Sequence, residues 1–439
     1  MKKFLINTSG CQMNEHDSEK IAGILEGMGY GPTLDRYEAD IIIFNTCAVR
    51  KSAEDKVFGQ LGEYKELKKK RPETIIGICG CMMQREDIRD YFLSKHKHID
   101  LVFGTNNIHK LPQLIQRQLE TNKTVIDIVE DTREIEENIN ADRKYSYKAF
   151  VDINYGCDNY CTYCIVPYTR GRERSRDPKI IIDEIVGLAK NGCKEITLLG
   201  QNVNSYGNTL DTEYTFPKLL EEINGIDGIE RIRFMTSHPK DFSDDLIESY
   251  RTLDKLCPHL HLPVQSGSNR VLKAMNRKYT REEYLNKIDK IKELLPNVAL
   301  TTDIIVGFPG ETEEDFEQTI DLVKKIQYDS AYTFLYSIRE GTIAAKMKDQ
   351  IPDDIKHKRF QLLVDTLNEI GLKHNQKLIG TTQRVLVEEI SKNDKTVLSG
   401  RAESSKLVHF KADKSLIGKI VDVKIDSVNT FTLHGFIID

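Results

Sequence analysis

Three cysteines within a short run constrain this chain more than any other feature of its sequence. Cys157, Cys161 and Cys164, the loop cysteines, have the spacing C-x3-C-x2-C, which gathers three thiolates on one tight loop. Three thiolates can bind three irons of a [4Fe–4S] cube and leave the fourth iron open for a substrate or cofactor. Structural zinc is the alternative, but zinc sites usually close with four ligands, and no fourth cysteine or histidine lies beside this loop.

The length and composition fit a soluble globular protein of about three domains. The chain has 439 residues, of which 39% are hydrophobic and 30% charged, and a formal net charge of −5. The N-terminus turns polar too early for a signal peptide, and no apolar run approaches the roughly 18 residues of a membrane span. Nine cysteines without such a signal indicate a reducing compartment. We therefore expect a cytoplasmic protein without membrane contact, and RNA contacts only through local basic patches.

Alternating strand and helix patterns predict that residues 1–140 form a Rossmann-like α/β domain with a mostly parallel sheet. Strands are predicted at 3–7, 41–45, 74–78 and 101–103, and helices at 18–28, 53–70 and 84–94. The polar, acid-rich stretch at 129–138 has the composition of a linker.

A second alternating series predicts a partial (β/α)6 barrel over residues 145–372, open on one side. Its strands are predicted at 150–155, 195–199, 231–235, 259–264, 299–306 and 331–336, with helices at 179–190, 216–223, 281–294 and 312–326. In such barrels the chemistry lies at the carboxyl ends of the strands. The loop cysteines directly follow the first strand, which places them at that end.

Residues 373–439 read as a small five-stranded β-barrel, because short β-like runs follow one another without helices. The runs are 384–388, 396–401, 407–410, 419–425 and 430–437. From residue 372 onward there are 11 Lys+Arg against 8 Asp+Glu, a local balance of +3. An RNA-contacting module and an ordinary solvated surface are equally compatible with this pattern. The basic and aromatic candidates are Lys406, His409, Phe410, Lys411, Lys414 and Lys419.

Three more cysteines, the strand-end cysteines, each follow a predicted strand of the first domain: Cys11, Cys47 and Cys81. The ends of parallel strands meet at one edge of a sheet, so these thiolates could hold a second cube with an open iron. Three unrelated buried cysteines are the alternative. Cys79 competes with Cys81, and we expect its side chain on the same face but deeper. The remaining two, Cys193 and Cys257, are expected to be core residues.

Polar or glycine residues mark the carboxyl ends of several predicted barrel strands. Tyr163, between two loop cysteines, could place its ring on a cofactor or serve the structure alone. In the fourth strand, alternation places His259 and His261 on one face, where packing is the default interpretation. The other candidates are Gly200, Gln201 and Asn202 after the second strand, Ser237 and His238 after the third, Gln265 after the fourth and Asp303 in the fifth.

Four arginines lie within seven residues just after the loop cysteines: Arg170, Arg172, Arg174 and Arg176. Guanidinium forks suit carboxylates and phosphates. A solvated charge run is the alternative. Proximity to the cysteine loop favours a role toward a cofactor carboxylate or an RNA phosphate.

At these residues the sequence resembles the radical S-adenosylmethionine (SAM) methylthiotransferases. The likeness covers all three predicted domains, in the runs 10–14, 17–19, 45–50, 80–82, 156–176, 200–206 and 261–268. The runs at 10–14 and 47–50 resemble the branch that acts on isopentenyladenosine in tRNA. Related enzymes of the family act instead on a ribosomal-protein aspartate or on tRNA that carries threonylcarbamoyladenosine. The C-terminal barrel looks like the TRAM domain, an RNA-binding module.

The resemblance implies two [4Fe–4S] clusters, one on the loop cysteines and an auxiliary one on the strand-end cysteines. SAM at the first cluster would yield a 5′-deoxyadenosyl radical, which removes hydrogen from C2 of isopentenyladenosine at position 37, in the anticodon stem-loop of tRNA. A first SAM would methylate a sulfur at the auxiliary cluster, and the methylthio group would then pass to the substrate radical. The candidate SAM-binding residues are Tyr163, Arg176, Gly200, Gln201, Asn202, Ser237, Gln265 and Asp303.

The same resemblance implies an electron donor such as flavodoxin or ferredoxin. We expect a monomer, since no heptad seam is present. A non-catalytic iron–sulfur carrier or RNA-binding redox sensor is the alternative, which the open-iron spacing disfavours. The sequence departs from the family where Ile338 and Glu340 stand in place of expected prolines, and where Cys79 accompanies Cys81.

Overall fold

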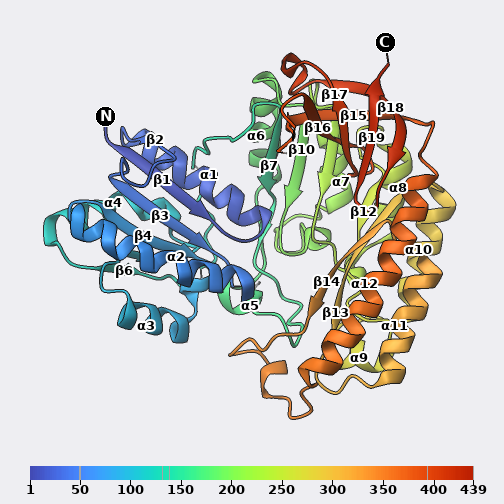
Figure 1. Ribbon diagram of the computed structural model, residues 1–439, viewed down its shortest axis with the longest axis horizontal. Coiled ribbons are helices and arrows are strands. Elements are labelled where there is room, and N and C mark those ends of the chain that lie inside the picture. Colours follow the sequence, from blue (N-terminus) through green and yellow to red (C-terminus); the bar gives the residue numbers. More distant parts are fainter. Residues whose placement is uncertain (49–50, 131, 138, 393, 439) are drawn as a thin grey trace.

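The computed structural model describes residues 1–48, 51–130, 132–137, 139–392 and 394–438, and for residues 51–56 only the backbone is described. An α/β domain, an open barrel and a small closed β-barrel follow one another along the chain (Figure 1). Six residues of the predicted motifs, linker and C-terminal domain lie outside the described residues: Val49, Arg50, Asp131, Asn138, Asn393 and Asp439.

Six parallel strands form the sheet of the N-terminal domain, in the order β2-β1-β3-β4-β5-β6. β3 and β4 are buried along their whole length because helices cover both faces. The doubly wound, Rossmann-like prediction is confirmed, although β2 and β6 have no counterpart in it. The strands are β1 (Lys3–Thr8), β2 (Gly31–Pro32), β3 (Ile41–Thr46), β4 (Ile75–Gly80), β5 (Leu101–Phe103) and β6 (Val125–Asp127).

Two helices pack on each face of this sheet. α1 (Gln12–Gly27) and α4 (Leu111–Thr121) share one apolar core with it, and α2 (Lys51–Lys70) and α3 (Glu86–Lys95) share the other. α1 begins six residues before the predicted start at 18. Its first turns bury the polar side chains of Asn14, His16 and Asp17 instead of an apolar stripe, so hydrophobic periodicity does not reveal them.

Two three-stranded parallel sheets form the open barrel, in the orders β11-β10-β7 and β12-β13-β14. A bridge from Ile232 to Leu256 joins them, and within the described residues β7 and β14 are not paired. The prediction of six strands with one open side is confirmed. The strands are β7 (Lys148–Asp152), β10 (Glu195–Leu199), β11 (Arg231–Phe234), β12 (His259–His261), β13 (Ala299–Val306) and β14 (Ser330–Leu335).

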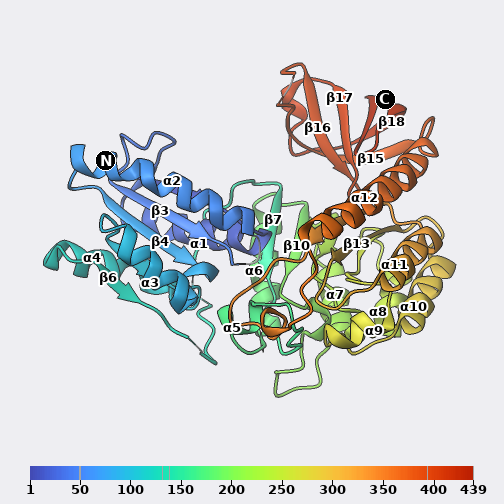
Figure 2. The same ribbon diagram turned by 60° about the horizontal axis from the view of Figure 1, so that its bottom comes forward.

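Helices cover the outside of the barrel and enclose one large apolar core with it. They are α6 (Pro178–Lys190), α7 (Phe216–Asn224), α8 (Asp244–Thr252), α10 (Arg281–Leu294), α11 (Glu313–Ile326) and α12 (Asp353–Gln376). α12 runs through the predicted domain boundary at 372/373 and leads into the C-terminal barrel (Figure 2). Across the described ranges, no helix combines the length and apolar character that a membrane crossing requires.

The C-terminal domain is a closed barrel in the strand order β15-β16-β17-β19-β18, which confirms the predicted five strands. Phe410 is only 2% exposed and lies in the core of this barrel. The expectation that Phe410 contacts RNA is therefore wrong, because its position on β17 points inward. The strands are β15 (Thr382–Ile390), β16 (Val397–Ala402), β17 (Leu407–Lys411), β18 (Ile420–Val428) and β19 (Thr432–Ile437).

The C-terminal barrel docks on the amino ends of the open-barrel strands. Arg231 donates to the carbonyl of Arg384 (2.7 Å), and Arg233 donates to that of Ala402 (2.8 Å). Lys406 pairs with Asp329 at 2.7 Å, so this lysine holds two domains together and is not free for RNA. In both views the C-terminal barrel lies at the opposite end from α5 (Val166–Thr169), which follows the loop cysteines (Figures 1 and 2).

Candidate functional site

The loop cysteines lie where the sequence places them, at the carboxyl end of the barrel strands. They follow β7 and the short strand β8 (Asn154–Tyr155), which pairs with β9 (Arg174–Ser175) to close the loop. Gly156 begins this loop with a φ of +75°, and a Cβ there would lie 2.0 Å from the Arg172 carbonyl oxygen. Only glycine fits this close approach of the two ends.

Burial sets the chemistry of the loop thiols. It raises the pKa of Cys157 to about 11 and that of Cys164 to about 12. Such thiols stay protonated at neutral pH unless a cation takes the place of the proton, which is what iron ions do when thiolates bind them. Three free thiols on one loop are the donors that iron–sulfur clusters use, so the residues present fit such a cluster.

A buried arginine lies beside these thiols. The Nη1 of Arg277 is 3.5 Å from the Sγ of Cys161, its Nη2 donates to the Pro263 carbonyl (2.7 Å) and its Nε donates to the Tyr279 hydroxyl (3.0 Å). The contact with Cys161 joins residues 116 positions apart, and no pattern near Arg277 in the sequence signals it.

The strand-end cysteines meet at the carboxyl edge of the N-terminal sheet. A hydrogen bond from Cys47, assisted by the charge of Arg170, lowers the pKa of Cys11 to about 6. At Gly10 a Cβ would lie 2.5 Å from the Cβ of Cys47, so the chain passes very close to that side chain. Cys81 completes the group, and the Nε of Arg170 lies 3.2 Å from its Sγ.

Neither group of thiols converges on a single point. Within the described part of the chain, no three His, Cys, Asp or Glu side chains could hold one metal ion together. A four-iron cube binds each thiolate through a different iron, so its ligands need not share a metal ion. The ligand roles of the six cysteines stay predictions.

Cys79 and Cys81 occupy different surroundings, which corrects the expectation that they share a face. Cys79 lies in the apolar core beneath α1 and α4. Gly80 ends β4 with a φ of +95°, and this turn directs Cys81 toward Ala48 and Ile165 at the domain interface. The strand alternation therefore stops before Cys81. Cys193 and Cys257 are buried, as expected of core residues.

Unpartnered polar atoms lie at the ends of the next barrel strands. The Oγ of Ser237, the Nε2 of His238 and the Oε1 of Gln265 are buried, and none has a hydrogen-bond partner among the described residues. Buried polar atoms in folded proteins nearly always have partners. These three atoms can therefore accept or donate to the polar groups of a bound ligand, and they fit a cofactor such as SAM.

Other predicted SAM contacts already have protein partners. The Oε1 of Gln201 accepts from the backbone N–H of Gly156, and Asn202 donates to Asp241 at 2.7 Å. Gly200 allows a close approach, since a Cβ there would lie 1.7 Å from the Oδ1 of Asn154. These residues lie at the carboxyl end of the barrel beside the loop cysteines. Their contact with SAM stays a prediction.

Asp303 lies near the histidine pair of the barrel. Its Oδ1 is 3.5 Å from the Nε2 of His261. His259 and His261 both reach the Oγ1 of Thr301 at 3.0 Å, which confirms that they share a face and pack there. A SAM contact at Asp303 also stays a prediction.

Tyr163 and Arg176 make structural contacts. The ring of Tyr163 packs beside a small apolar cluster that includes Phe308. Arg176 pairs with Glu137 at 2.6 Å and with Glu184 at 2.9 Å. Their predicted contact with SAM is not tested by these interactions.

The arginine run after the loop is largely buried. Arg170, Arg174 and Arg176 are at most 8% exposed, and only Arg172 lies at the surface, where it pairs with Asp158 at 2.7 Å. The solvated alternative is thus wrong for three of the four. The buried arginines contact protein groups instead of presenting their guanidinium groups to a phosphate.

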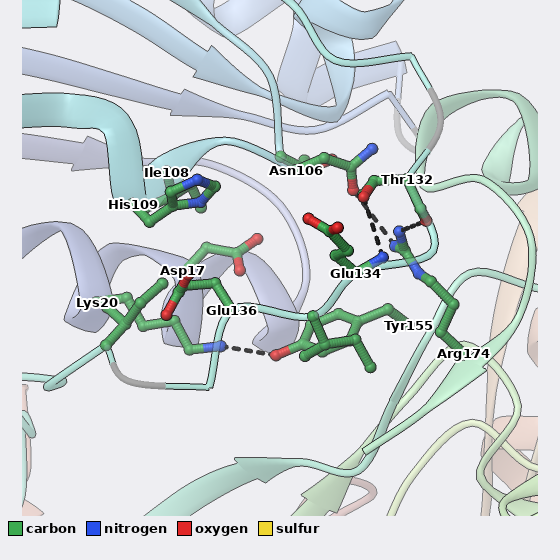
Figure 3. A pocket seen from close by; sticks show the side chains of 13 residues that line it. Asp17, Lys20, Asn106, Ile108, His109, Thr132, Glu134, Glu136, Tyr155 and Arg174 are labelled. Atoms are coloured by element: carbon green, nitrogen blue, oxygen red, sulfur yellow. Dashed lines mark hydrogen bonds between the residues drawn. The ribbon is translucent and has the colours of Figure 1, made fainter. Parts of the chain in front are cut away.

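Arg174 belongs to a polar interface between the first two domains (Figure 3). Lys20 of α1 donates to Asp152 (2.6 Å) and to the Tyr155 hydroxyl (3.0 Å) of the barrel. A cavity of about 60 Å³, enough for a few waters, lies beside them. Its wall includes Asp17, Lys20, Asn106, Glu134, Tyr155 and Arg174.

Comparison with known proteins gives the same three-part division. Residues 151–323 match the Radical SAM superfamily, residues 3–104 match Uncharacterized protein family UPF0004, and residues 376–438 match the TRAM domain. A tRNA-2-methylthio-N(6)-dimethylallyladenosine synthase of Alkaliphilus oremlandii is 56% identical over 437 residues, which cover 100% of this chain and 93% of the relative. One from Clostridium botulinum is 57% identical over 433 residues, covering 99% and 96%.

Solved structures show the same fold at low sequence identity. The radical S-adenosylmethionine methyltransferase TsrM from Kitasatospora setae, solved with cobalamin and a [4Fe–4S] cluster, has a TM-score of 0.57 and 13% identity. The match covers 88% of this chain and 77% of that one. This likeness supports the arrangement of the N-terminal α/β domain beside the barrel.

Proposed function

The chain belongs to the family of tRNA-2-methylthio-N(6)-dimethylallyladenosine synthases, which are radical SAM enzymes, and we propose how its residues carry out that reaction. The enzyme uses SAM and two [4Fe–4S] clusters to convert isopentenyladenosine in tRNA to its 2-methylthio derivative. The loop cysteines hold the SAM-binding cluster, and the strand-end cysteines hold the auxiliary cluster. When bound, these groups supply the substrate-activating radical and the methylated sulfur.

The protein positions the two clusters through one short segment. Ile165 directly follows the last loop cysteine and packs against Cys81 and Ala48 of the other domain. Five residues later, the guanidinium of Arg170 reaches Cys81. This adjacency is the observation that carries the proposal, because two reaction sites must face one substrate to exchange a group.

The strand ends next to the loop cysteines bind SAM. The free atoms of Ser237, His238 and Gln265 receive its polar groups. Gln265 has a φ of +70°, which turns the chain away from β12 and fixes this side chain at the strand end. Their burial excludes water from the site where a reactive species forms.

The substrate base enters beside the loop cysteines. Tyr160 and Tyr168 are 38% and 48% exposed there, with ring centroids 6.3 Å apart. Exposed aromatic rings stack on bases that have left a helix or loop, as a modified anticodon-loop base must. We place position 37 of tRNA at this rim.

The TRAM domain binds tRNA at a distance from the reaction site. Its exposed lysines include Lys411, Lys414 and Lys419. The C-terminal barrel lies at the opposite end of the open barrel from α5, so its lysines contact a part of the tRNA other than the reacting base. We propose a cytoplasmic monomer that receives electrons from a flavodoxin or ferredoxin.

An anaerobic assay tests this function. Reconstituted protein is incubated with SAM, a strong reductant and tRNA carrying isopentenyladenosine, and the digested nucleosides are examined by mass spectrometry. We expect a mass gain of CH2S on that nucleoside, because a methylthio group replaces one hydrogen. Release of 5′-deoxyadenosine without the mass gain would contradict the assignment of isopentenyladenosine as the substrate. Absence of both products would contradict the assignment as a radical SAM enzyme.

A further inference from the structure

The side chain of Arg170 extends from the open barrel to the strand-end cysteines. It caps α5 and is 5% exposed. Its Nε lies 3.2 Å from the Sγ of Cys81, and its Nη2 lies 2.7 Å from the Oδ2 of Asp17 and 3.3 Å from the Oδ1 of Asn14. One buried side chain of the second domain therefore contacts three residues of the first.

The partners of Arg170 are themselves fixed. Asn14 donates through Nδ2 to the Thr46 carbonyl at 2.8 Å, and its Oδ1 lies 3.7 Å from the Sγ of Cys11. The pair formed by Arg170 and Asn14 thus touches Cys81 on one side and Cys11 on the other. Two of the three strand-end cysteines meet the same hydrogen-bond network.

The backbone on the Arg170 side is equally constrained. Its N–H donates to the Val166 carbonyl at 2.8 Å, and its carbonyl accepts from Arg174 at 3.2 Å. Since Arg170 lies six positions after Cys164, the loop and strand-end cysteines share one rigid connection. A displacement of either domain would break the contact with Cys81.

We propose that Arg170 is a positioning residue that fixes the position of the auxiliary cluster relative to the SAM-binding cluster. Arg170 also raises the reduction potential of the auxiliary cluster, while Asp17 lowers that potential. This inference rests on the proposed function, because it takes Cys81 as a ligand of that cluster. The hydrogen bond and positive charge of Arg170 stabilise the more negative, reduced cluster. The carboxylate of Asp17 partly cancels that charge.

Opposite charges give the proposal an opposite-sign test. The full-length C157A/C161A/C164A variant lacks the loop cysteines and retains the strand-end cysteines. In that background, the midpoint potential of the remaining cluster is measured by redox titration with electron paramagnetic resonance, at equal iron content. We expect Arg170→Gln to shift it downward and Asp17→Asn to shift it upward. Arg172→Gln, which changes the exposed arginine nearby, should leave it unchanged.

The outcomes separate the inference from the proposed function. Equal midpoint potentials in the Arg170 and Asp17 variants, or shifts of the same sign, would contradict the proposal that Arg170 raises the reduction potential of the auxiliary cluster. If Arg170→Gln fails to retain iron, the midpoint potentials of Asp17→Asn and Arg170→Lys test the proposal instead. Arg170→Lys keeps the positive charge, so its potential should remain closer to that of the parent. A parent variant without any cluster would instead contradict the auxiliary site itself.

Positioning has its own readout in the otherwise unmodified enzyme. Arg170→Gln should release 5′-deoxyadenosine at a rate close to that of the parent but form several-fold less methylthiolated nucleoside. A proportional loss of both products would contradict the positioning role.

Discussion

At each cysteine site a buried guanidinium lies within reach of one thiol. Arg170 is balanced by Asp17, whereas Arg277, beside Cys161, donates to two neutral groups, the Pro263 carbonyl and the Tyr279 hydroxyl. A buried charge is stabilised by the opposite charge nearest to it. We therefore expect the thiolates of a cluster on the loop cysteines to supply the negative partner of Arg277.

Arg277 should govern retention of the SAM-binding cluster. We expect Arg277→Met to lose iron from the loop cysteines and to lower thermal stability, because the Pro263 carbonyl loses a buried donor at a cost of about 2 kcal/mol. Iron and sulfide analysis after anaerobic gel filtration checks this. Lys278→Met, at an exposed neighbour, serves as the control, and equal iron in both variants would contradict the role.

Cys79 and Cys81 provide a matched pair at the auxiliary site. Cys81→Ala should remove about half of the bound iron, since one of two equal clusters loses a ligand. Cys79→Ala should keep the iron and cost only about 1 kcal/mol of stability, because that thiol packs in the core. Iron content of the two reconstituted variants measures the difference, and iron loss in the Cys79 variant would reverse the assignment.

Helix α1 is the element on which the domain interface depends. It carries Asn14 and Asp17 toward Arg170, and Lys20 toward Asp152. The linker after the N-terminal domain returns across the same helix, where Arg143 pairs with Glu19 at 3.2 Å. The predicted linker at 129–138 also contacts both domains: the Val129 carbonyl accepts from Gln84, and Glu137 pairs with Arg176 at 2.6 Å.

Gly23 is required where the linker crosses α1. A Cβ at Gly23 would lie 2.1 Å from the Asn140 carbonyl oxygen, so Gly23→Ala must displace the linker although alanine is the better helix former. We expect a lower melting temperature and faster proteolysis between 129 and 146. Gly62→Ala in α2 is the control, because no atom lies within 4 Å of the added Cβ. An unchanged rate of proteolysis would contradict the prediction, because it would show that the linker accommodates the added methyl group without loss of stability.

Across the whole molecule, the reaction site and the TRAM domain lie at opposite ends of the open barrel. The docking contacts of Arg231, Arg233 and Lys406 fix that separation. A tRNA bound at both ends must follow the outside of the enzyme. This arrangement separates general backbone binding from recognition of the reacting base.

Two lysines of the TRAM domain should behave oppositely. Lys411→Ala should weaken tRNA binding and reduce the salt dependence of log Kd by about one unit, because an exposed phosphate contact is lost. Lys406→Ala should mainly lower the melting temperature, because its partner Asp329 lies in the barrel. Titrations at several salt concentrations and thermal unfolding check both, and an unaltered salt slope in the Lys411 variant would contradict the RNA contact.

Features that depend on neighbouring residues could be predicted from the sequence alone. The strand–helix alternation and the β-runs of the last domain are local patterns, so the three-part fold could be predicted. The spacing of the loop cysteines is also local and predicted their place at the carboxyl end of the barrel strands, while their role as cluster ligands stays a prediction. The start of α1 could not be predicted, because its buried face is polar.

Which distant groups meet depends on how the domains pack. Strand ends predicted that Cys11 and Cys47 would approach, but the turn at Gly80 separated Cys81 from Cys79, and no spacing revealed the partners of Arg170 and Arg277. These contacts join residues far apart in the chain, and their geometry follows from how the domains pack. Burial of their charges becomes favourable only after that packing is complete.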